Sequence, residues 1–250
     1  MVELAEFPNE ILLDIFVNLD LTALIHTRGV CCLWRNLVQV AKIPRVRRRL
    51  LQFYFKAVNS AAFLDTRKYI LPNIRNIDRS TFVARLPASS PEELRCWLLE
   101  WPEKAIVGWI WPGLPVEPPK GIPSDVSLHA CGSNFMGLTH FPRISTLLFY
   151  NPNSSRPQED ENSYHIISWN TSWWQSVDVE TVRVDLLSIC SFNPAPLLGT
   201  VVTEKLSGEM QTIASSWTDF LELELAREEW DLSGQGIYAA SEVFNLWPIR

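Results

Sequence analysis

The chain has 250 residues, of which 47% are hydrophobic and 20% are charged. This apolar content is sufficient for a sizeable core and excludes a wholly disordered chain. The formal net charge of −6 disfavours attraction of the whole surface to nucleic acid or to an anionic membrane.

Cysteine usage and the first residues bear on the compartment. The cysteines form an odd, scattered set that does not suit a disulfide framework: Cys31, Cys32, Cys96, Cys131 and Cys190. The N-terminal stretch lacks the basic and apolar regions of a secretory signal, and no run of about 18 apolar residues predicts a membrane span. We therefore expect a cytoplasmic or nuclear chain, or both, that contacts neither membrane nor nucleic acid.

Short helices are predicted at the N-terminus, over residues 8–17, 21–28, 31–41 and 45–57. In the first, apolar residues recur at spacings of three and four and give one apolar face: Ile11, Leu12, Ile15, Phe16 and Leu19. Asp20 is suited to cap the second helix, and Gly29 to end it. Such short helices bury too little surface to be stable alone, so their apolar stripe predicts a partner.

The rest of the chain predicts a mixed α+β domain. After a looser stretch at 59–88, Ser90 and Pro91 followed by two Glu are typical of a helix start. That helix is expected to reach Trp101, and another is expected from Pro102 to Trp111. Strands are expected at 146–150, 164–169, 181–187 and 198–203, and a last helix at 216–229. Helices followed by strands indicate an α+β fold with a mainly antiparallel sheet.

The N-terminal pattern resembles the F-box. It opens with an apolar residue, Pro, any residue and Glu at positions 7–10, although Phe7 stands where Leu is usual. A Leu-Asp turn follows at 19–20. The stretch 30–35 then matches the closing pattern Val-Cys-x-x-Trp-Arg. The resemblance extends through the first three expected helices and the turns between them.

This resemblance implies docking to a Skp-type adaptor, which tethers an F-box protein to a cullin and a RING subunit. The expected adaptor-binding residues are Phe7, Pro8, Ile11, Leu12, Ile15, Phe16, Leu19, Leu24 and Trp34. The alternative is that this apolar stripe packs against the chain's own downstream domain, as most amphipathic helices do.

The C-terminal part resembles the domain that follows an F-box in many fungal proteins of this size. That domain is related to the cell-wall-synthesis-regulator (SUKH) superfamily, and the resemblance rests on residues 99–114 and 213–221. The superfamily is known mainly for protein binding, which implies a recognition role. The expected organisation is an F-box hook at 1–45, a helical linker region at 46–89 and a partner-binding α+β domain at 90–250. Residues from about Ser60 onward are expected to fold alone.

Two polar clusters allow alternative interpretations. The basic run Arg45, Arg47, Arg48 and Arg49 is compatible with nucleic-acid binding or nuclear import, but a solvated helix face, available to an acidic partner, is favoured. His129, Cys131 and His140 are compatible with a zinc site or with a Cys–His nucleophile. Because no Cys-x-x-Cys pair accompanies them, we favour loop or core residues and assign no catalytic residue, metal or cofactor.

Tryptophan is frequent, with 11 in the chain. Four of them could either line a ligand groove or belong to the core: Trp97, Trp101, Trp109 and Trp111. The helical spacing of Trp97 and Trp101 favours the core. Trp173 and Trp174 are adjacent, and adjacent residues on a strand point to opposite faces. One of them is therefore expected to be exposed, which makes this pair the candidate partner-binding surface.

Together these patterns predict a non-catalytic substrate-recognition subunit of a cullin-RING (SCF-type) ubiquitin ligase. Its partners would be a Skp-type adaptor, through it a cullin, and an unidentified substrate protein held by the C-terminal domain. The alternative is an interaction scaffold that does not promote ubiquitination. An enzyme is less favoured, because no nucleophile elbow, phosphate-binding loop or dinucleotide fingerprint is present.

Overall fold

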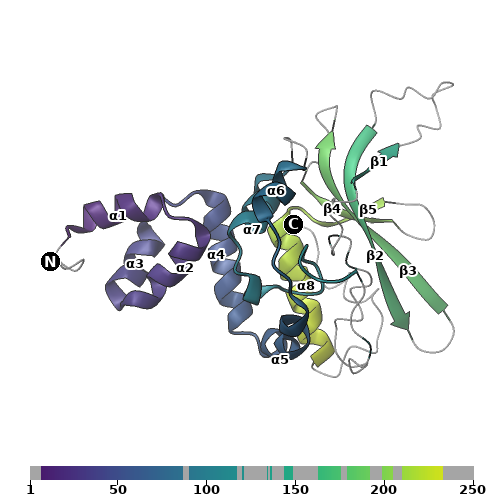
Figure 1. Ribbon diagram of the computed structural model, residues 1–250, viewed down its shortest axis with the longest axis horizontal. Coiled ribbons are helices and arrows are strands. Elements are labelled where there is room, and N and C mark those ends of the chain that lie inside the picture. The colour runs from purple at the N-terminus through teal and green to yellow at the C-terminus, as the bar shows by residue number, and fades with distance from the viewer. Residues whose placement is uncertain are drawn as a thin grey trace.

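A small helical region at the N-terminus is joined to a larger body of helices, with the sheet on the far side of that body (Figure 1). The computed structural model describes residues 7–86, 90–116, 120, 134, 136, 144–148, 163–175, 179–191, 199–204 and 210–232. For most of the sheet this description covers the backbone and its pairing. Within these residues, none of the helices has the length and apolar character needed to cross a membrane.

The N-terminal region is helical, as predicted from the sequence. Its helices are α1 (Asn9–Val17), α2 (Leu21–Val30) and α3 (Cys32–Val40). Pro8 directly precedes α1, where its missing N–H costs nothing because that group would have no helical partner. Asp20 Oδ1 accepts a hydrogen bond from the Ala23 N–H at 2.7 Å and so caps α2.

The body begins at α4 and contains the other described helices. They are α4 (Arg45–Val58), α5 (Ala61–Ile70), the 3₁₀ turn η2 (Leu71–Asn73), α6 (Arg79–Ala84), α7 (Glu92–Glu100), the 3₁₀ turn η3 (Glu103–Ala105) and α8 (Trp217–Leu232). Side chains of Ser60 and Asp78 cap α5 and α6, accepting hydrogen bonds from the N–H groups of Phe63 and Thr81.

The described strands form one sheet in which every strand pairs with its neighbour in the chain. They are β1 (Ile144–Leu148), β2 (Ser163–Gln175), β3 (Val179–Ser191), β4 (Val201–Glu204) and β5 (Met210–Ala214). All four of these pairings are antiparallel. The long hairpin of β2 and β3 extends from the body on the side away from the N-terminal helices (Figure 1).

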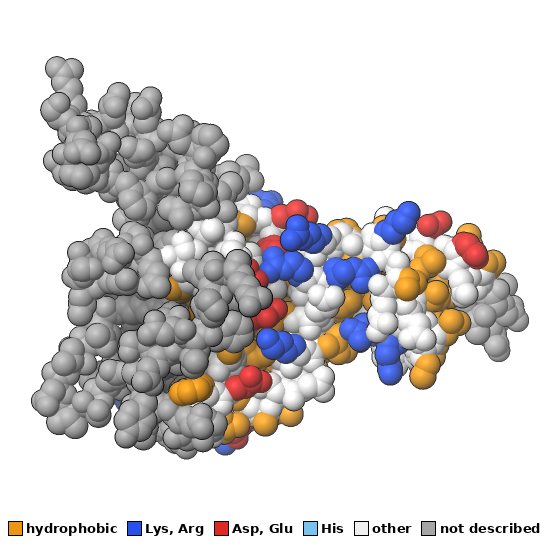
Figure 2. Space-filling model, turned by 180° about the vertical axis from the view of Figure 1, so that it is seen from behind, with side chains coloured by type: hydrophobic (Ala, Val, Ile, Leu, Met, Phe, Trp, Pro, Cys, Tyr) orange, Lys and Arg blue, Asp and Glu red, His pale blue; other side chains and the backbone are white. Residues whose placement is uncertain are grey.

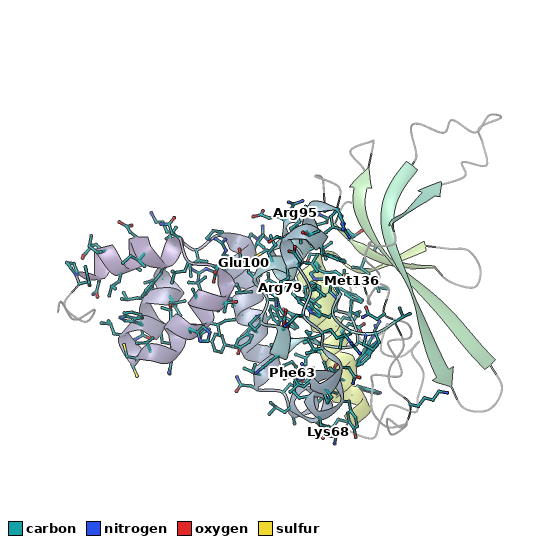
Figure 3. All side chains as sticks on the ribbon, in the orientation of Figure 1. Phe63, Lys68, Arg79, Arg95, Glu100 and Met136 are labelled. Atoms are coloured by element: carbon teal, nitrogen blue, oxygen red, sulfur yellow. The ribbon has the colours of Figure 1, made fainter. Side chains whose placement is uncertain are left out.

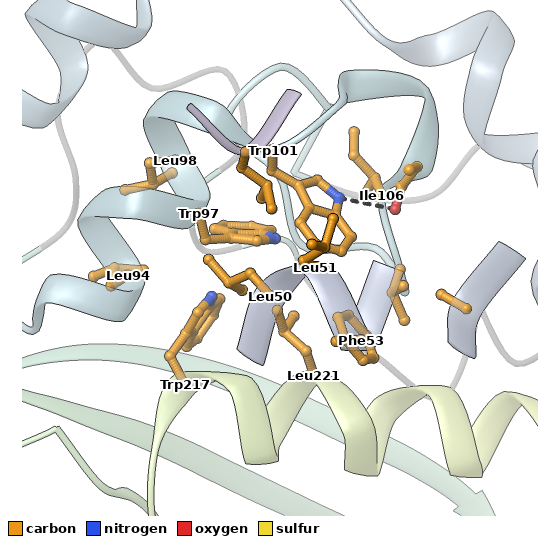
Figure 4. Close-up of a cluster of buried hydrophobic side chains, with 14 of the residues drawn as sticks. Leu50, Leu51, Phe53, Leu94, Trp97, Leu98, Trp101, Ile106, Trp217 and Leu221 are labelled. Atoms are coloured by element: carbon orange, nitrogen blue, oxygen red, sulfur yellow. Dashed lines mark hydrogen bonds between the residues drawn. The ribbon is translucent and has the colours of Figure 1, made fainter. Parts of the chain in front are cut away.

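Tryptophans form the centre of the core in the body. The Trp97 ring lies edge-on to two others, 4.9 Å from Trp111 and 5.1 Å from Trp217 between ring centroids. Trp101 stacks on Phe53 of α4 at 5.5 Å. Figure 4 shows how Trp97, Trp101, Trp217 and Phe53, with leucines around them, join α4, α7 and α8. Buried aromatic rings remove large areas from water, so they contribute strongly to the stability of this body.

Three expectations about the first half of the chain were wrong. The stretch 59–88 is not loose, because it contains α5 and α6. The helix expected from Pro102 to Trp111 is limited to η3, after which the chain continues without regular structure to residue 116. Ser90 does not cap α7: the helix begins at Glu92, and Ser90 Oγ has no hydrogen-bond partner among the described residues.

Helix α4 lies in the core rather than in a linker. Leu50, Leu51 and Phe53 are buried, and they belong to the same cluster as the tryptophans of α7 and α8. The segment 46–89, expected to be a helical linker region, therefore contributes part of the hydrophobic core.

Candidate functional site

The N-terminal helices carry large apolar side chains on their surface. Phe7, Ile11 and Ile15 are spaced by four residues along α1 and the two residues before it, and they are 37%, 45% and 41% exposed. Val30 at the end of α2 and Leu33 at the start of α3 are 60% and 46% exposed. Figure 2 shows apolar side chains gathered over this end of the molecule. We call Phe7, Ile11, Ile15, Val30 and Leu33 the apolar face; such groups of exposed apolar residues mark interaction surfaces.

The structure divides the nine predicted adaptor-binding residues into three groups. Phe7, Pro8, Ile11 and Ile15 are exposed, and Leu19 and Trp34 are partly buried. The remaining three, Leu12, Phe16 and Leu24, are at most 1% exposed.

The three buried residues require a correction, because they cannot reach a partner while the helices stay folded. Phe16 instead meets the ring of Trp34 edge-on at 5.4 Å, which fixes α1 against α3. The buried residues Leu12, Phe16 and Leu24 thus pack the helices together beneath the apolar face. The residues available for direct contact with a partner are the exposed ones.

Two residues of the apolar face were missed by the sequence analysis. Leu33 was expected to point inward, and Val30 was noted only as part of the F-box pattern. Both flank Cys31 and Cys32, which are also exposed. The helical geometry breaks at Cys31, where φ is −159° and ψ is 171°, between α2 and α3. Exposure at such a junction depends on tertiary packing, so periodicity alone gave no signal for it.

A carboxylate fixes the N-terminal helices to the body. The Leu21 N–H at the start of α2 donates to Glu100 Oε2 at 2.8 Å, and Thr22 Oγ1 donates to the Glu100 carbonyl at 2.7 Å. Arg47 of α4 donates to both carboxylate oxygens, at 2.8 and 2.7 Å. Glu100 lies where the two regions meet (Figure 3). Bidentate, charge-assisted hydrogen bonds of this kind are directional, so they set the orientation of one region to the other.

These contacts shift the pKa values of both partners. Burial of Glu100 raises its pKa, but the hydrogen bonds from Arg47 and from the Leu21 N–H outweigh burial and hold the pKa below its ordinary value. The hydrogen bond to Glu100 raises the pKa of Arg47. The pair is therefore ionised at neutral pH.

The basic run in α4 is used mainly within the chain, which corrects the favoured interpretation of a solvated face. Besides Arg47, Arg49 donates to Asp219 Oδ1 at 2.6 Å, to Ser216 Oγ at 3.0 Å and to the carboxylate of Glu93. Arg48 donates to backbone carbonyls at the end of α3. Arg45 alone of the four is exposed. Three of these arginines thus stabilise the packing of α4 against α3, α7 and α8.

The described part of the body offers no second candidate site. Trp97, Trp101, Trp109 and Trp111 are at most 1% exposed, so the core interpretation is confirmed and the groove interpretation is wrong. Among the described residues, no group of three or more His, Cys, Asp or Glu side chains is placed to hold a metal ion. His129, Cys131 and His140 lie outside the described residues.

The candidate partner-binding tryptophans lie on β2, and their side chains are outside the described part of the structure. Trp173 is paired with Thr181 and Trp174 with Glu180, next to the end of the β2–β3 hairpin. Their role in partner binding stays a prediction.

Comparison with known proteins agrees with the geometry of the N-terminal end. Residues 4–42 match the F-box-like family model. No curated protein and no solved structure matches the chain. The matched residues include α1, α2 and α3 and all of the apolar face. The N-terminal region of this chain is therefore an F-box-like domain.

Proposed function

We propose that this chain is the substrate-recognition subunit of a cullin-RING (SCF-type) ubiquitin ligase. The F-box-like domain docks onto a Skp-type adaptor, and the body binds the target protein without performing chemistry on it. The observation that carries the proposal is the apolar face within the residues that match the F-box-like family. F-box domains generally serve as such docking modules, and a face of this kind is suited to a helix-in-groove contact.

The revised contact set is Phe7, Ile11, Ile15, Val30 and Leu33. Burying these side chains would supply the hydrophobic driving force, at about 25 cal/mol for each Å² removed from water. A charge placed among them would be desolvated without a partner, which costs several kcal/mol and is enough to abolish a micromolar complex.

Target binding is assigned to the body, with the β2–β3 hairpin as the proposed surface. Figure 1 supports this choice, because the hairpin extends away from the docking end. A target held there would not obstruct an adaptor bound to the F-box-like domain. Trp173 and Trp174 near the end of this hairpin are the proposed contact residues, and the SUKH-like resemblance of the body is a hypothesis consistent with protein binding.

The test is affinity purification of three tagged full-length chains followed by mass spectrometry. The chains are wild type, the Ile11→Asp, Ile15→Asp variant, and Leu64→Asp as a matched control on an exposed apolar residue of α5. Wild type and the control should retain a Skp-type adaptor and a cullin, and the double variant should lose both. Retention by the double variant would overturn the docking assignment.

The turnover of bound proteins distinguishes the ubiquitin-ligase receptor from the scaffold alternative. If the adaptor binds but loss of the apolar face leaves the turnover of every co-purified protein unchanged, the scaffold alternative would replace the receptor proposal. A Trp173→Ala, Trp174→Ala variant should keep the adaptor and lose the target protein.

A further inference from the structure

Two arginines meet at the junction of α2 and α3 without a described acidic partner. Arg28 lies in the last turns of α2, and Arg35 lies on α3. Arg35 Nε donates to the Arg28 carbonyl oxygen at 3.4 Å, so the two residues are held at the same junction. Neither forms an ion pair among the residues that the structure describes. This distinguishes them from Arg47 and Arg49, which each pair with carboxylates of the body.

The surroundings of Arg28 leave hydrogen-bonding capacity unused. Its guanidinium lies over the ring of Phe55, 3.9 Å from the ring centroid, and its Nε is buried without a hydrogen-bond partner in the described structure. Burial, and then the charge of Arg35, hold the pKa of Arg28 below its ordinary value. Two like charges and an unsatisfied donor raise the free energy of this junction, and an anion between the guanidiniums would lower it.

The position of the pair indicates which anion it meets. Val30 and Leu33 lie between the two arginines in sequence, and both belong to the apolar face. A protein that covers these side chains brings its polar rim to the guanidiniums, because interfaces have an apolar centre and a polar edge. Guanidinium groups bind carboxylates through directional, charge-assisted hydrogen bonds.

We propose that Arg28 and Arg35 form a carboxylate-binding pair for an acidic side chain of the adaptor, at the edge of the apolar face. This inference rests on the proposed function and adds a polar anchor to it. The apolar face supplies driving force without much direction, whereas the pair fixes the register of α2 and α3 on the adaptor and speeds the encounter at low salt.

The experiment measures the dissociation constant of the purified adaptor and full-length chain at low and high salt. The Arg28→Gln, Arg35→Gln variant should bind about tenfold more weakly or worse at low salt, as expected for charge-assisted hydrogen bonds. Its affinity should also depend less on salt than that of wild type, since a screened attraction has been removed. The matched control is Lys42→Gln, Arg45→Gln, which removes the same charge from exposed residues in the α3–α4 turn and at the start of α4 and should bind within about threefold of wild type.

The single variant Arg35→Gln guards against a folding defect, because Arg28 also packs on Phe55 whereas Arg35 is exposed. This variant should have the same melting temperature as wild type and still bind the adaptor more weakly. Neutralising the adaptor's acidic residues one at a time should then reveal one whose loss has no further effect in the Arg35→Gln chain.

Equal affinities for the arginine variants and the control would overturn the pair while leaving the docking function intact. So would the absence of any coupled acid on the adaptor. If wild type itself fails to bind the adaptor, both the proposed function and the carboxylate-binding role of the two arginines are wrong.

Discussion

The F-box-like domain and the body place their large apolar residues in opposite ways. Six of the ten large apolar side chains that the described structure exposes lie between Phe7 and Val40, although this stretch is short. The other four are spread over the body, from Leu64 to Leu232. Five tryptophans of the body are instead fully buried: Trp97, Trp101, Trp109, Trp111 and Trp217. The difference indicates that the body is stabilised by its own core, whereas the N-terminal domain is shaped for a surface that another protein completes.

Helix α4 links the two regions, because it packs against both. Its buried face belongs to the core of the body, while Phe55 lies beneath Arg28 of α2 and Arg47 reaches the carboxylate that holds α2. We therefore propose a boundary ahead of α4, between Ile43 and Arg45, in place of the boundaries expected at 45, 89 and 90.

The largest effect should come from removing α4. A fragment of residues 44–250 keeps the buried side chains of Leu50, Leu51 and Phe53, and a fragment of residues 60–250 lacks them. Losses of about 2–5 kcal/mol for each large core side chain would together exceed most of the total stability of a domain. The longer fragment should show a cooperative transition and strong near-UV circular dichroism, and the shorter one neither. A shorter fragment that folds as well as the longer one would support the expectation that residues from Ser60 fold alone.

Truncating one buried tryptophan should have the second-largest effect on stability. Trp217 is fully buried against Trp97 and Phe220, so Trp217→Ala should lower the free energy of unfolding by about 3–5 kcal/mol. Denaturant titration of the full chain gives this value. A loss below about 1 kcal/mol would show that the surrounding rings repack, which core truncations of this size rarely allow.

The contacts of Glu100 that hold the F-box-like domain to the body should contribute less to stability, and their contribution should depend on pH. Glu100→Gln keeps one acceptor oxygen but loses the charge that Arg47 and the Leu21 N–H bind, for an expected cost of about 1–3 kcal/mol at neutral pH. Because the folded pKa of Glu100 is depressed, its contribution is fully present above the unfolded value, about 4.3, and is lost as pH falls through the folded pKa.

Unfolding free energies measured from pH 7 down to acid pH should therefore converge for wild type and Glu100→Gln. Arg47 stays charged throughout this range and adds no slope. If the two curves of unfolding free energy against pH run parallel, the carboxylate charge does not stabilise the contact between the two regions.

The smallest effect on stability should come from the apolar face. Ile11 and Ile15 are already 45% and 41% exposed, so Ile11→Ala, Ile15→Ala should change the free energy of unfolding by less than about 1 kcal/mol in total. The same variant should bind the adaptor much more weakly. Phe16→Ala is the matched contrast on α1, since its side chain is buried and its loss should destabilise the domain first. A double variant as unstable as Phe16→Ala would place the two isoleucines in the core.

The sequence predicted the parts of this molecule that depend on local patterns. Periodic apolar residues and the capping Asp20 indicated the helices of the F-box-like domain, and the helical spacing of Trp97 and Trp101 indicated a core position. What it could not separate was the inner from the outer side of α1, because Ile11, Leu12, Ile15 and Phe16 fit the same apolar stripe. The packing of Trp34 on Phe16 decides that question.

Other features depend on contacts between distant residues. The partners of Arg47 and Arg49 lie on α7 and α8, more than 40 residues away along the chain, so a solvated basic helix was the natural expectation. The caps at Ser60 and Asp78 were local signals, yet they were overlooked within a stretch that looked irregular.

The exposed thiols of Cys31 and Cys32 provide the most direct test of adaptor docking, because they lie between Val30 and Leu33 on the apolar face. Cys96 is an internal control: burial, and then the charge of Glu100, raise the pKa of its thiol to about 12, so it should stay unreactive. Maleimide labelling of the full chain, followed by peptide-resolved mass spectrometry, should show fast modification of Cys31 and Cys32 that the adaptor slows strongly. Unchanged labelling of both cysteines in a demonstrably formed complex would contradict docking through this face.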